Sequence, residues 1–420
     1  MEFLKRFSIR DKKQIKLIVI ILSRKDDFLS KYKYKIIGGN MYQINNILNT
    51  IIQGNTLEVL KNIPDNSINM VITSPPYWGL RCYNTNPQIW DGDENCKHEW
   101  NTEIIRKRTN GDVPGKNSLI AKCRPNDIVN RPDIVSNICI KCGAWKGELG
   151  SEPTYEMYIN HLIQIFDEVR RVLKDDGTCW VNLGDSYAGS NQGAGTKNLS
   201  SKQASNRGTN YMTTETHKSL LKNCGIKPKS LVGIPDRFKI AMIDNGWICR
   251  NDIIWHKPNA MPESVKDRFT DDYERLFFFV KNRKYYFEQQ KEPSINAGKI
   301  ITLGEKSFSK GQAKGMGVKP SGNGNVKIYE VPKFKNKRSV WSINTKPFKE
   351  AHFAVFPEEL IETPIKAGCP ENGIVMDIFM GSGTTAVVAQ KLNRNYIGIE
   401  LNPEYIKIAE NRINNIKITN

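Results

Sequence analysis

Four consecutive residues, Ser74-Pro75-Pro76-Tyr77, have types and spacing that suit a planar base carrying an amino group. The apolar run over 68–72 predicts a short buried strand, which the two prolines end because proline cannot donate to a sheet ladder. Each proline fixes its own φ and biases the preceding residue toward extended backbone, so the loop is stiff. A rigid row of oxygen acceptors followed by aromatic rings can meet both the edge and the face of a base.

The chemistry of this loop follows from the amino group. An exocyclic amino nitrogen is a weak nucleophile because its lone pair is delocalised into the ring, and preorganised acceptors of its N–H groups localise that pair. Ser74 Oγ and the Pro75 carbonyl are the candidate acceptors, and Tyr77 offers a face on which an extruded base could stack. The alternative is a proline-rich turn with a buried tyrosine, which is the more frequent explanation of an isolated Ser-Pro-Pro-Tyr.

A second motif lies near the C-terminus, over 373–385. It predicts a strand, a glycine-rich turn and a helix over 384–392, and the glycines Gly381 and Gly383 would let the backbone approach a ligand closely. Glu400 ends the next predicted strand, 396–399, where a carboxylate can hold ribose hydroxyls. Strand, turn, helix, strand and acid in this order indicate a nucleotide-cofactor fold.

The two motifs together resemble the amino-methylating DNA methyltransferases, in which Phe-x-Gly-x-Gly binds S-adenosylmethionine and (Ser/Asp/Asn)-Pro-Pro-Tyr is the catalytic loop. The catalytic loop comes first here, which is the order of that family's β group, and the Thr-Ser-Pro-Pro-Tyr form is similar to the cytosine-N4 subgroup. The resemblance implies that the catalytic residues are Ser74, Pro75, Pro76 and Tyr77. It implies that the cofactor-binding residues are Asp377, Phe379, Gly381, Gly383, Thr384 and Glu400, with Asn55 and Phe353 as further contacts.

The resemblance also implies a fold and a reaction. The expected fold is α/β, a Rossmann-like, mostly parallel seven-stranded sheet with helices on both faces. The expected reaction is direct transfer of the methyl group to cytosine N4 in double-stranded DNA, without a covalent enzyme intermediate. Adenine N6 is the alternative target, because some relatives with a serine loop methylate adenine. A restriction-modification or phage DNA-protection role, a cognate restriction endonuclease, a cytoplasmic location and no membrane partner are the corresponding expectations.

Composition fits this interpretation. Among 420 residues, 62 Lys and Arg face 44 Asp and Glu, a formal net charge of +18 that suggests a polyanionic partner. A lysine-rich and asparagine-rich genome is the alternative explanation of the excess. Nine cysteines do not reach the density of a small disulfide scaffold.

Changes in composition divide the chain. The expected parts are an atypical basic extension 1–40, a catalytic half 41–82, an insert 83–153, a continued catalytic domain 154–280 with a mobile loop 187–225, a target-recognition region 281–345 and a cofactor half 346–420. Met41 is a hypothetical native start. The apolar run over 17–22 is too short to span a bilayer, which needs about 20 residues.

The insert does not have the pattern of a sheet, but it contains residues of the types that bind zinc. Cys96 and His98 form one pair, and Cys139 and Cys142, followed by a glycine, form a second. Three thiolates and an imidazole are a ligand set that structural zinc prefers. Reduced surface cysteines are the alternative, and Cys123 could replace one ligand.

The segment 281–340 is the candidate for target recognition because it contains fourteen Lys and Arg against four Glu, a net charge of +10. Its seven glycines predict loops, and aromatic residues alternate with the charges. A solvated, partly disordered insertion is the alternative. The candidate DNA contacts are Lys281, Arg283, Lys284, Lys333, Lys335, Lys337 and Arg338.

Two shorter patterns lie beside the expected active site. A strand over 179–183 leads to Asp185, which we expect either to orient the catalytic loop or to cap a turn. His256-Lys257-Pro258-Asn259 is similar to the family's base-pocket motif. An amphipathic helix is predicted over 155–173 because Leu162, Phe166 and Val169 recur at helical spacing.

Overall fold

The computed structural model describes residues 41–80, 85–101, 137–189, 224–304, 326–346 and 356–416. Residues from Tyr42 onward form one compact unit. The helices in this part of the chain are α2 (Ile44–Ile47), α3 (Thr56–Lys61), α4 (Tyr155–Val172), α8 (Ile234–Asp244), α10 (Glu358–Gly368), α11 (Thr384–Lys391) and α12 (Pro403–Asn414).

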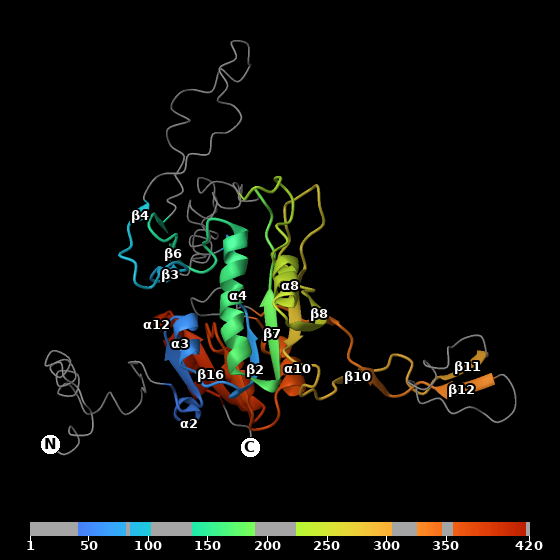
Figure 1. Ribbon diagram of the computed structural model, residues 1–420. Coiled ribbons are helices and arrows are strands. Elements are labelled where there is room, and N and C mark those ends of the chain that lie inside the picture. The colour runs from blue at the N-terminus through green and yellow to red at the C-terminus, as the bar shows by residue number, and fades with distance from the viewer. Residues whose placement is uncertain are drawn as a thin grey trace, which may run out of the picture. The chain divides into compact units, whose positions relative to one another are not determined.

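One large sheet runs through the unit (Figure 1). Its order is β1-β16-β15-β2-β7-β9-β8-β14, and β9 is the strand that runs antiparallel to its neighbours. The predicted α/β fold with a mostly parallel sheet is therefore confirmed. The strands are β1 (Thr50–Gln53), β2 (Ile68–Thr73), β7 (Leu173–Leu183), β8 (Ile248–His256), β9 (Tyr273–Val280), β14 (Val340–Ser342), β15 (Ile374–Asp377) and β16 (Asn395–Glu400).

The predicted strand number was wrong, because the sheet has eight strands and not seven. The extra strand is β14, which pairs in parallel with β8 through Val340 and Ile254, Trp341 and Trp255, and Ser342 and His256. It lies inside the segment expected to recognise DNA. Three residues are too few to show an alternating pattern, so sequence periodicity could not reveal this edge strand.

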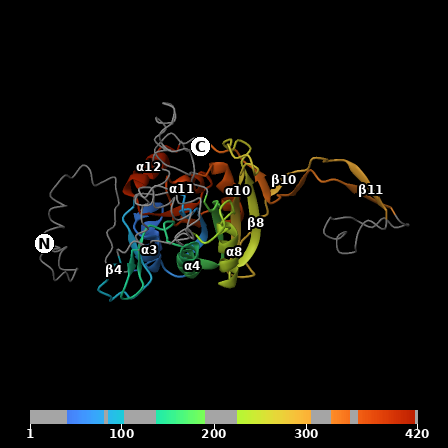
Figure 2. The same cartoon turned by 90° about the horizontal axis from the view of Figure 1, so that it is seen from above.

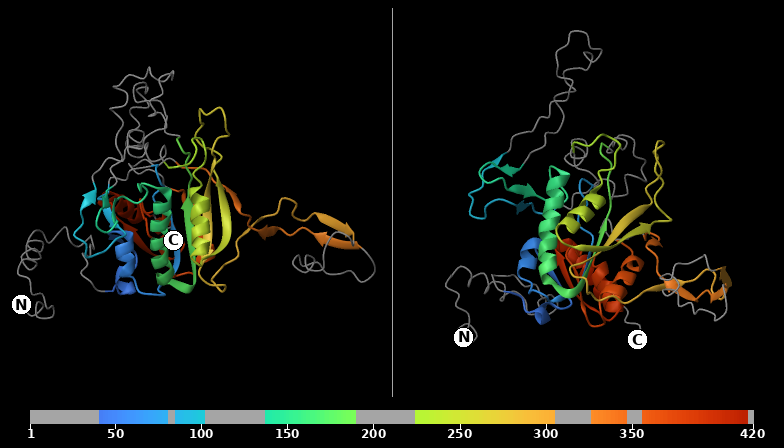
Figure 3. Two further views of the ribbon diagram at one scale, coloured as in Figure 1. Left: turned by 45° about the horizontal axis from the view of Figure 1, so that its top comes forward. Right: turned by 45° about the vertical axis from the view of Figure 1, so that its right-hand side comes forward.

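Helices cover both faces of the sheet. Figure 2 shows α3, α4 and α8 on one face and α10, α11 and α12 on the other. The left view of Figure 3 shows α3 in blue, α4 in green and α8 in yellow side by side. This two-layer cover is what parallel strands require, since both of their faces must be kept from water.

The central strands are apolar on both sides for the same reason. In β9, Phe277, Phe278 and Phe279 are all buried. The Phe278 ring stacks on Trp180 at 4.0 Å between centroids, whereas Phe277 and Phe279 contact Phe238 of α8. Successive side chains of one strand thus fill the two opposite cores.

Helix α4 follows its predicted pattern closely. Thr154 caps it by accepting a hydrogen bond from the Met157 N–H at 3.2 Å, and Leu162, Phe166 and Val169 are fully buried. The helix ends at Val172, and β7 begins at the next residue. The strand predicted over 179–183 therefore starts earlier than expected, at Leu173.

The expectation that the insert contains no sheet was also wrong. Its described residues form a small antiparallel sheet of order β3-β6-β5-β4. The strands have two or three residues each, which hides them from pattern analysis. They are β3 (Gln88–Trp90), β4 (Trp100–Asn101), β5 (Ile138–Cys139) and β6 (Trp145–Gly147).

The basic segment forms two antiparallel pairs where loops were expected. Strand β10 (Lys291–Pro293) pairs with β13 (Phe334–Asn336), and β11 (Ile300–Gly304) pairs with β12 (Val326–Glu330). The segment 187–225, which we expected to be a mobile loop, lies largely outside the described residues. No helix in the described part of the chain is both long and apolar enough to cross a membrane.

Packing of α10 on the sheet leads to a stability prediction. A Cβ added at Gly368 would lie 2.8 Å from Trp180 Nε1, and the Gly368 carbonyl accepts a hydrogen bond from Thr178 Oγ1 at 2.9 Å. We expect Gly368→Ala to lower the free energy of unfolding by about 1–3 kcal/mol, because the helix must move away from β7. Urea denaturation measures this, with Lys366→Ala on the half-exposed side of the same helix as the control. A Gly368→Ala protein as stable as the control would contradict the packing.

Candidate functional site

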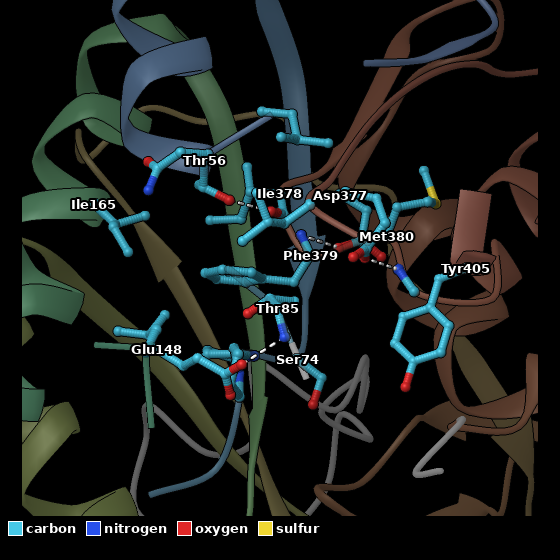
Figure 4. Close-up of a pocket in the computed structure, with 18 of the residues that line it drawn as sticks. Thr56, Ser74, Thr85, Glu148, Ile165, Asp377, Ile378, Phe379, Met380 and Tyr405 are labelled. Carbon is cyan, nitrogen blue, oxygen red and sulfur yellow. Dashed lines mark hydrogen bonds between the residues drawn. The ribbon is translucent and has the colours of Figure 1, made fainter. Parts of the chain in front are cut away.

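The two sequence motifs meet at one edge of the sheet. The Ser-Pro-Pro-Tyr loop follows β2, and the glycine-rich loop follows β15, which pairs in parallel with β2. Because the carboxyl ends of neighbouring parallel strands share an edge, both loops border the same pocket. Figure 4 shows Ser74 from the first loop and Asp377, Phe379 and Met380 from the second around this space.

A buried carboxylate joins the two loops. Asp377 Oδ1 accepts hydrogen bonds from Thr73 Oγ1 at 2.7 Å and from the Phe379 N–H at 3.1 Å, while Oδ2 accepts one from Thr385 Oγ1 at 2.6 Å. The residue is 1% exposed, and burial raises the pKa of Asp377 to about 6 against the opposing effect of these hydrogen bonds. Asp377 therefore ties the end of β2 to the first turn of α11.

Glu400 holds the glycine-rich loop from the next strand. Its Oε2 accepts a hydrogen bond from the Gly381 N–H at 2.8 Å, and its Oε1 accepts one from the Asn402 N–H at 2.8 Å. Burial raises the pKa of the Glu400 carboxyl. The Glu400 carboxylate retains acceptor capacity toward the pocket that it lines.

The two predicted glycines have different positions. Gly381 lines the pocket, with φ of 52°. Gly383 has φ of 80° and precedes α11, and a Cβ added there would lie 2.7 Å from the Ala409 Cβ of α12. Gly383 is not among the residues that line the pocket, whereas Thr384 beside it is. A glycine at position 383 is therefore needed for close packing between α11 and α12.

The Ser-Pro-Pro-Tyr loop is held by hydrogen bonds that join its last two residues to α4 and β9. The Pro76 carbonyl accepts a hydrogen bond from Tyr158 Oη of α4 at 2.6 Å. Ser74 Oγ lies 3.4 Å from Tyr77 Oη as a hydrogen-bond donor, and Tyr77 Oη donates to Glu274 Oε2 at 2.7 Å. All four loop residues line the pocket.

Glu274 extends this network to a third part of the chain. Its second oxygen accepts a hydrogen bond from Lys257 Nζ, and both side chains are less than one-fifth exposed. Lys257 belongs to the segment that is similar to the base-pocket motif. The chain Ser74, Tyr77, Glu274, Lys257 therefore links the predicted catalytic loop to β9 and to the residue that follows β8.

The Tyr77 ring occupies a space that glycine provides. A Cβ at Gly184 would lie 2.7 Å from Tyr77 Cε2. The neighbouring Asp185 accepts hydrogen bonds from the Gly233 N–H at 2.9 Å and the Ile234 N–H at 3.1 Å, at the start of α8. Of the two roles expected for Asp185, the contacts show the capping role.

Asn55 lines the pocket, but its carbonyl oxygen is already used. Asn55 Oδ1 caps α3 by accepting from the Leu57 N–H at 2.8 Å and the Glu58 N–H at 3.3 Å, and Nδ2 donates to Gln88 at 3.1 Å. Both lone pairs expected for a cofactor amino group thus face the helix. Phe353 lies outside the described residues.

The insert supplies a wall that sequence reasoning missed. The sequence contains no signal for this wall, because the insert residues that line the pocket belong to no motif. Only the fold brings this part of the insert to the catalytic loop. The pocket residues from the insert are Thr85, Gln88, Trp90, Glu148 and Leu149. Other pocket residues that we did not predict are Thr56, Ile165, Phe356, Ile378, Met380, Ser382, Ile399, Leu401 and Tyr405.

The four predicted zinc ligands come together. One ligand atom from each of Cys96, His98, Cys139 and Cys142 lies within 4.8 Å of the other three. Forty residues of the chain separate the two pairs, so the small sheet is what makes them neighbours.

The predicted DNA contacts do not form one free cationic surface. Lys281 is 11% exposed, and its Nζ donates to the Leu173 carbonyl at 2.6 Å and lies 3.1 Å from Asp175. Glu292 pairs with Arg338 at 2.6 Å and Lys335 at 3.4 Å. Lys337 lies over the Trp341 ring, whereas Arg283, Lys284 and Lys333 are exposed.

Comparisons with known sequences identify the family of this chain. The sequence pattern of the N6_N4_Mtase family, described as DNA methylase, matches residues 68–411. The chain is 35% identical over 367 residues to the Type II methyltransferase M.Cfr9I of Citrobacter freundii, with 87% of each protein covered. It is 33% identical over 367 residues to the Type II methyltransferase M.SmaI of Serratia marcescens, which covers 86% of this chain and 90% of that protein. Among solved structures, the PvuII DNA methyltransferase (cytosine-N4-specific) matches 88% of each chain with 17% identity and a TM-score of 0.46.

The buried Asp377 gives a pH prediction. Its pKa rises from 3.8 in the unfolded chain to about 6 in the folded protein, so the folded state binds the proton more tightly. As pH rises from about 4 to about 6, the ionisation of Asp377 therefore lowers the free energy of unfolding by about 3 kcal/mol. We expect the difference in unfolding free energy between Asp377→Asn and the wild type to shift in favour of the variant over this interval.

The measurement is urea unfolding at several pH values between 4 and 7. The exposed Asp244, at the end of α8, provides the control variant Asp244→Asn. A difference between Asp377→Asn and the wild type that stays constant with pH would contradict the raised pKa.

Proposed function

Since this chain belongs to the N6_N4_Mtase family of DNA methylases, we propose that it transfers a methyl group from S-adenosylmethionine to N4 of cytosine in double-stranded DNA. The chain is a DNA methyltransferase of the N4/N6 type, related to the type II methyltransferases of restriction-modification systems. We also propose which DNA base is methylated, which residues contact the cofactor and which residues are catalytic.

One observation carries the proposal. The Ser-Pro-Pro-Tyr loop and the glycine-rich loop line the same pocket and are joined by the hydrogen bonds of Asp377. A reaction that moves one carbon atom between two bound molecules needs both sites within bonding reach, and a shared pocket meets that need. The Thr73-Ser74-Pro75-Pro76-Tyr77 form favours cytosine.

The residues around the pocket fit S-adenosylmethionine, which supplies an electrophilic methyl group on a sulfonium centre. Glu400 retains acceptor capacity for ribose hydroxyls, and the Gly381 turn leaves the backbone open to a close approach. Apolar groups from Ile378, Phe379 and Phe356 border the same space. We assign the cofactor to this part of the pocket.

Ser74 and the Pro75 carbonyl face the other substrate. We assign them the role of accepting hydrogen bonds from the amino group of an extruded base, which concentrates the lone pair on nitrogen. Tyr77 has its hydroxyl held by Glu274, so this network fixes the position of the loop before the base arrives. The nitrogen loses its proton after alkylation, and no strong base is required.

DNA would be held mainly through its phosphates. Exposed cations that form no ion pair within the described residues are the better candidates among those predicted, and they include Arg283, Lys284 and Lys333. Lys281 is the weakest candidate because its ammonium group is bound to backbone carbonyls and to Asp175.

The central test is product identification. We expect incubation with labelled S-adenosylmethionine and unmethylated genomic DNA, followed by digestion and mass spectrometry of nucleosides, to yield N4-methylcytosine. Ser74→Ala should slow the reaction about 100-fold or more while leaving cofactor affinity unchanged, because one preorganised acceptor is lost. N6-methyladenine would overturn the base assignment and keep the mechanism, and absence of any methylated nucleoside would overturn the proposal.

A second prediction concerns Glu274. Glu274→Gln keeps the side-chain shape but removes the charge that holds Tyr77 Oη and Lys257 Nζ. We expect the single-turnover rate to fall about 10- to 100-fold through a misplaced loop, with the cofactor Kd and the unfolding midpoint unchanged. Glu358→Gln, which breaks the surface pair with Lys391, is the matched control. Equal rates in the two variants would show that Glu274 does not position the loop.

A further inference from the structure

The distances among the four insert residues match a closed tetrahedral metal site. Cys96 Sγ lies 3.9 Å from Cys139 Sγ, and Cys142 Sγ lies 3.4 Å from His98 Nδ1. Tetrahedral zinc with ordinary bond lengths would place two sulfurs about 3.8 Å apart and a sulfur and a nitrogen about 3.5 Å apart. A disulfide would require about 2.05 Å between sulfurs, so the geometry excludes a Cys96–Cys139 bond in this state.

The backbone around the ligands is shaped to bring them together. Gly143 has φ of 78° and donates its N–H to the Cys139 carbonyl at 2.9 Å, which closes the turn that carries both sulfurs. Gly92 also has positive φ, and a Cβ there would lie 2.9 Å from Cys142 Sγ. The Ile140 N–H donates to the Glu99 carbonyl at 2.9 Å and joins the two halves of the insert.

The small sheet has little apolar core of its own. Its strands have two or three residues each, and its buried apolar side chains within the described residues are few, chiefly Trp90, Cys139, Ala144 and Trp145. Such a short sheet buries too little apolar surface to order itself, and small modules of this size commonly depend on a metal. Four protein ligands leave no open coordination position, which favours a structural role.

We propose that Cys96, His98, Cys139 and Cys142 bind a structural Zn²⁺ ion, and that this ion holds the insert wall of the pocket in place. The ion would fix β5 and the loop before β4. Because β5 pairs with β6 and β6 pairs with β3, fixing β5 would also fix the position of β3. Strand β3 carries Gln88 and Trp90 into the pocket. Loss of zinc would therefore weaken cofactor binding. This link between zinc and the cofactor rests on the proposed function.

The small sheet of the insert packs against a buried histidine of α4. The His161 ring is stacked by Trp90 at 4.7 Å and by Trp145 at 5.6 Å between centroids. Its Nε2 lies 2.9 Å from Asp91 and its Nδ1 lies 3.0 Å from Glu152, which is also buried. Side chains of β3 and β6 thus pack against one side chain of α4. This packing fixes the position of the small sheet next to the catalytic loop.

The first measurement is metal analysis of the full chain purified without chelator. We expect one zinc per chain, its loss in Cys142→Ser, and its retention in Cys249→Ser, whose half-buried thiol lies on β8 away from the cluster. Absence of zinc in wild-type protein whose four thiol and imidazole groups are unmodified would overturn the site. A disulfide between Cys96 and Cys139, found by mass spectrometry, would do the same.

The second measurement tests what the ion does. Hydrogen exchange at β3 and β6 should speed up when zinc is removed from the wild type, while exchange in β2 and β15 stays slow. Titration with S-adenosylmethionine should show a dissociation constant raised about tenfold or more in the zinc-free protein and restored by added zinc.

The outcomes separate the two proposals. Equal exchange at β3 and β6 with and without zinc would overturn the structural role, and equal cofactor affinity would overturn the coupling to the pocket. Failure of the zinc-loaded wild type to bind S-adenosylmethionine would overturn the cofactor assignment and the coupling, whereas the zinc content and the hydrogen exchange would still decide the metal site.

Discussion

The pocket depends on the burial of one carboxylate between two loops that are three hundred residues apart in the sequence. Asp377 ends β15, and its oxygens bond Thr73 at the end of β2 and Thr385 in the first turn of α11. A carboxylate without partners could not remain in this apolar position, so the cost of leaving it unpaired keeps both loops in register. The shared edge of parallel strands brings the loops close, and Asp377 then fixes their relative position.

Around this link, the chain builds the pocket from rigid pieces. The Ser-Pro-Pro-Tyr loop is tied to α4 through Tyr158 and to β9 through Glu274, and the glycine-rich loop is tied to β16 through Glu400. Each tie is a hydrogen bond to a group that is at least partly buried, where it is stronger than on the surface. A site that must position a weak nucleophile gains from this preorganisation, because little needs to move when substrates bind.

The insert changes how the site is understood. From sequence it was a separate module with candidate metal ligands, whereas in the structure it lies against α4 and gives the pocket one wall. The basic segment changes in the opposite direction. Its residues contribute β14 to the main sheet, and several of its cations are bound within the protein, as Lys281 and Arg338 show. Net charge indicated a polyanionic partner but could not identify which cations remain free.

The sequence by itself determined the fold class, the family and the two loops, because each rests on local patterns: an apolar run ended by prolines, a glycine turn between a strand and a helix, and helical spacing in α4. It also identified the four clustered residues of the insert, since ligand types are visible in the chain. Tertiary structure alone decided the eighth strand, the insert sheet and wall, the capping role of Asn55, and the link between Glu274 and Tyr77. These depend on short strands and on contacts between distant segments, for which neighbouring residues leave no periodic signal.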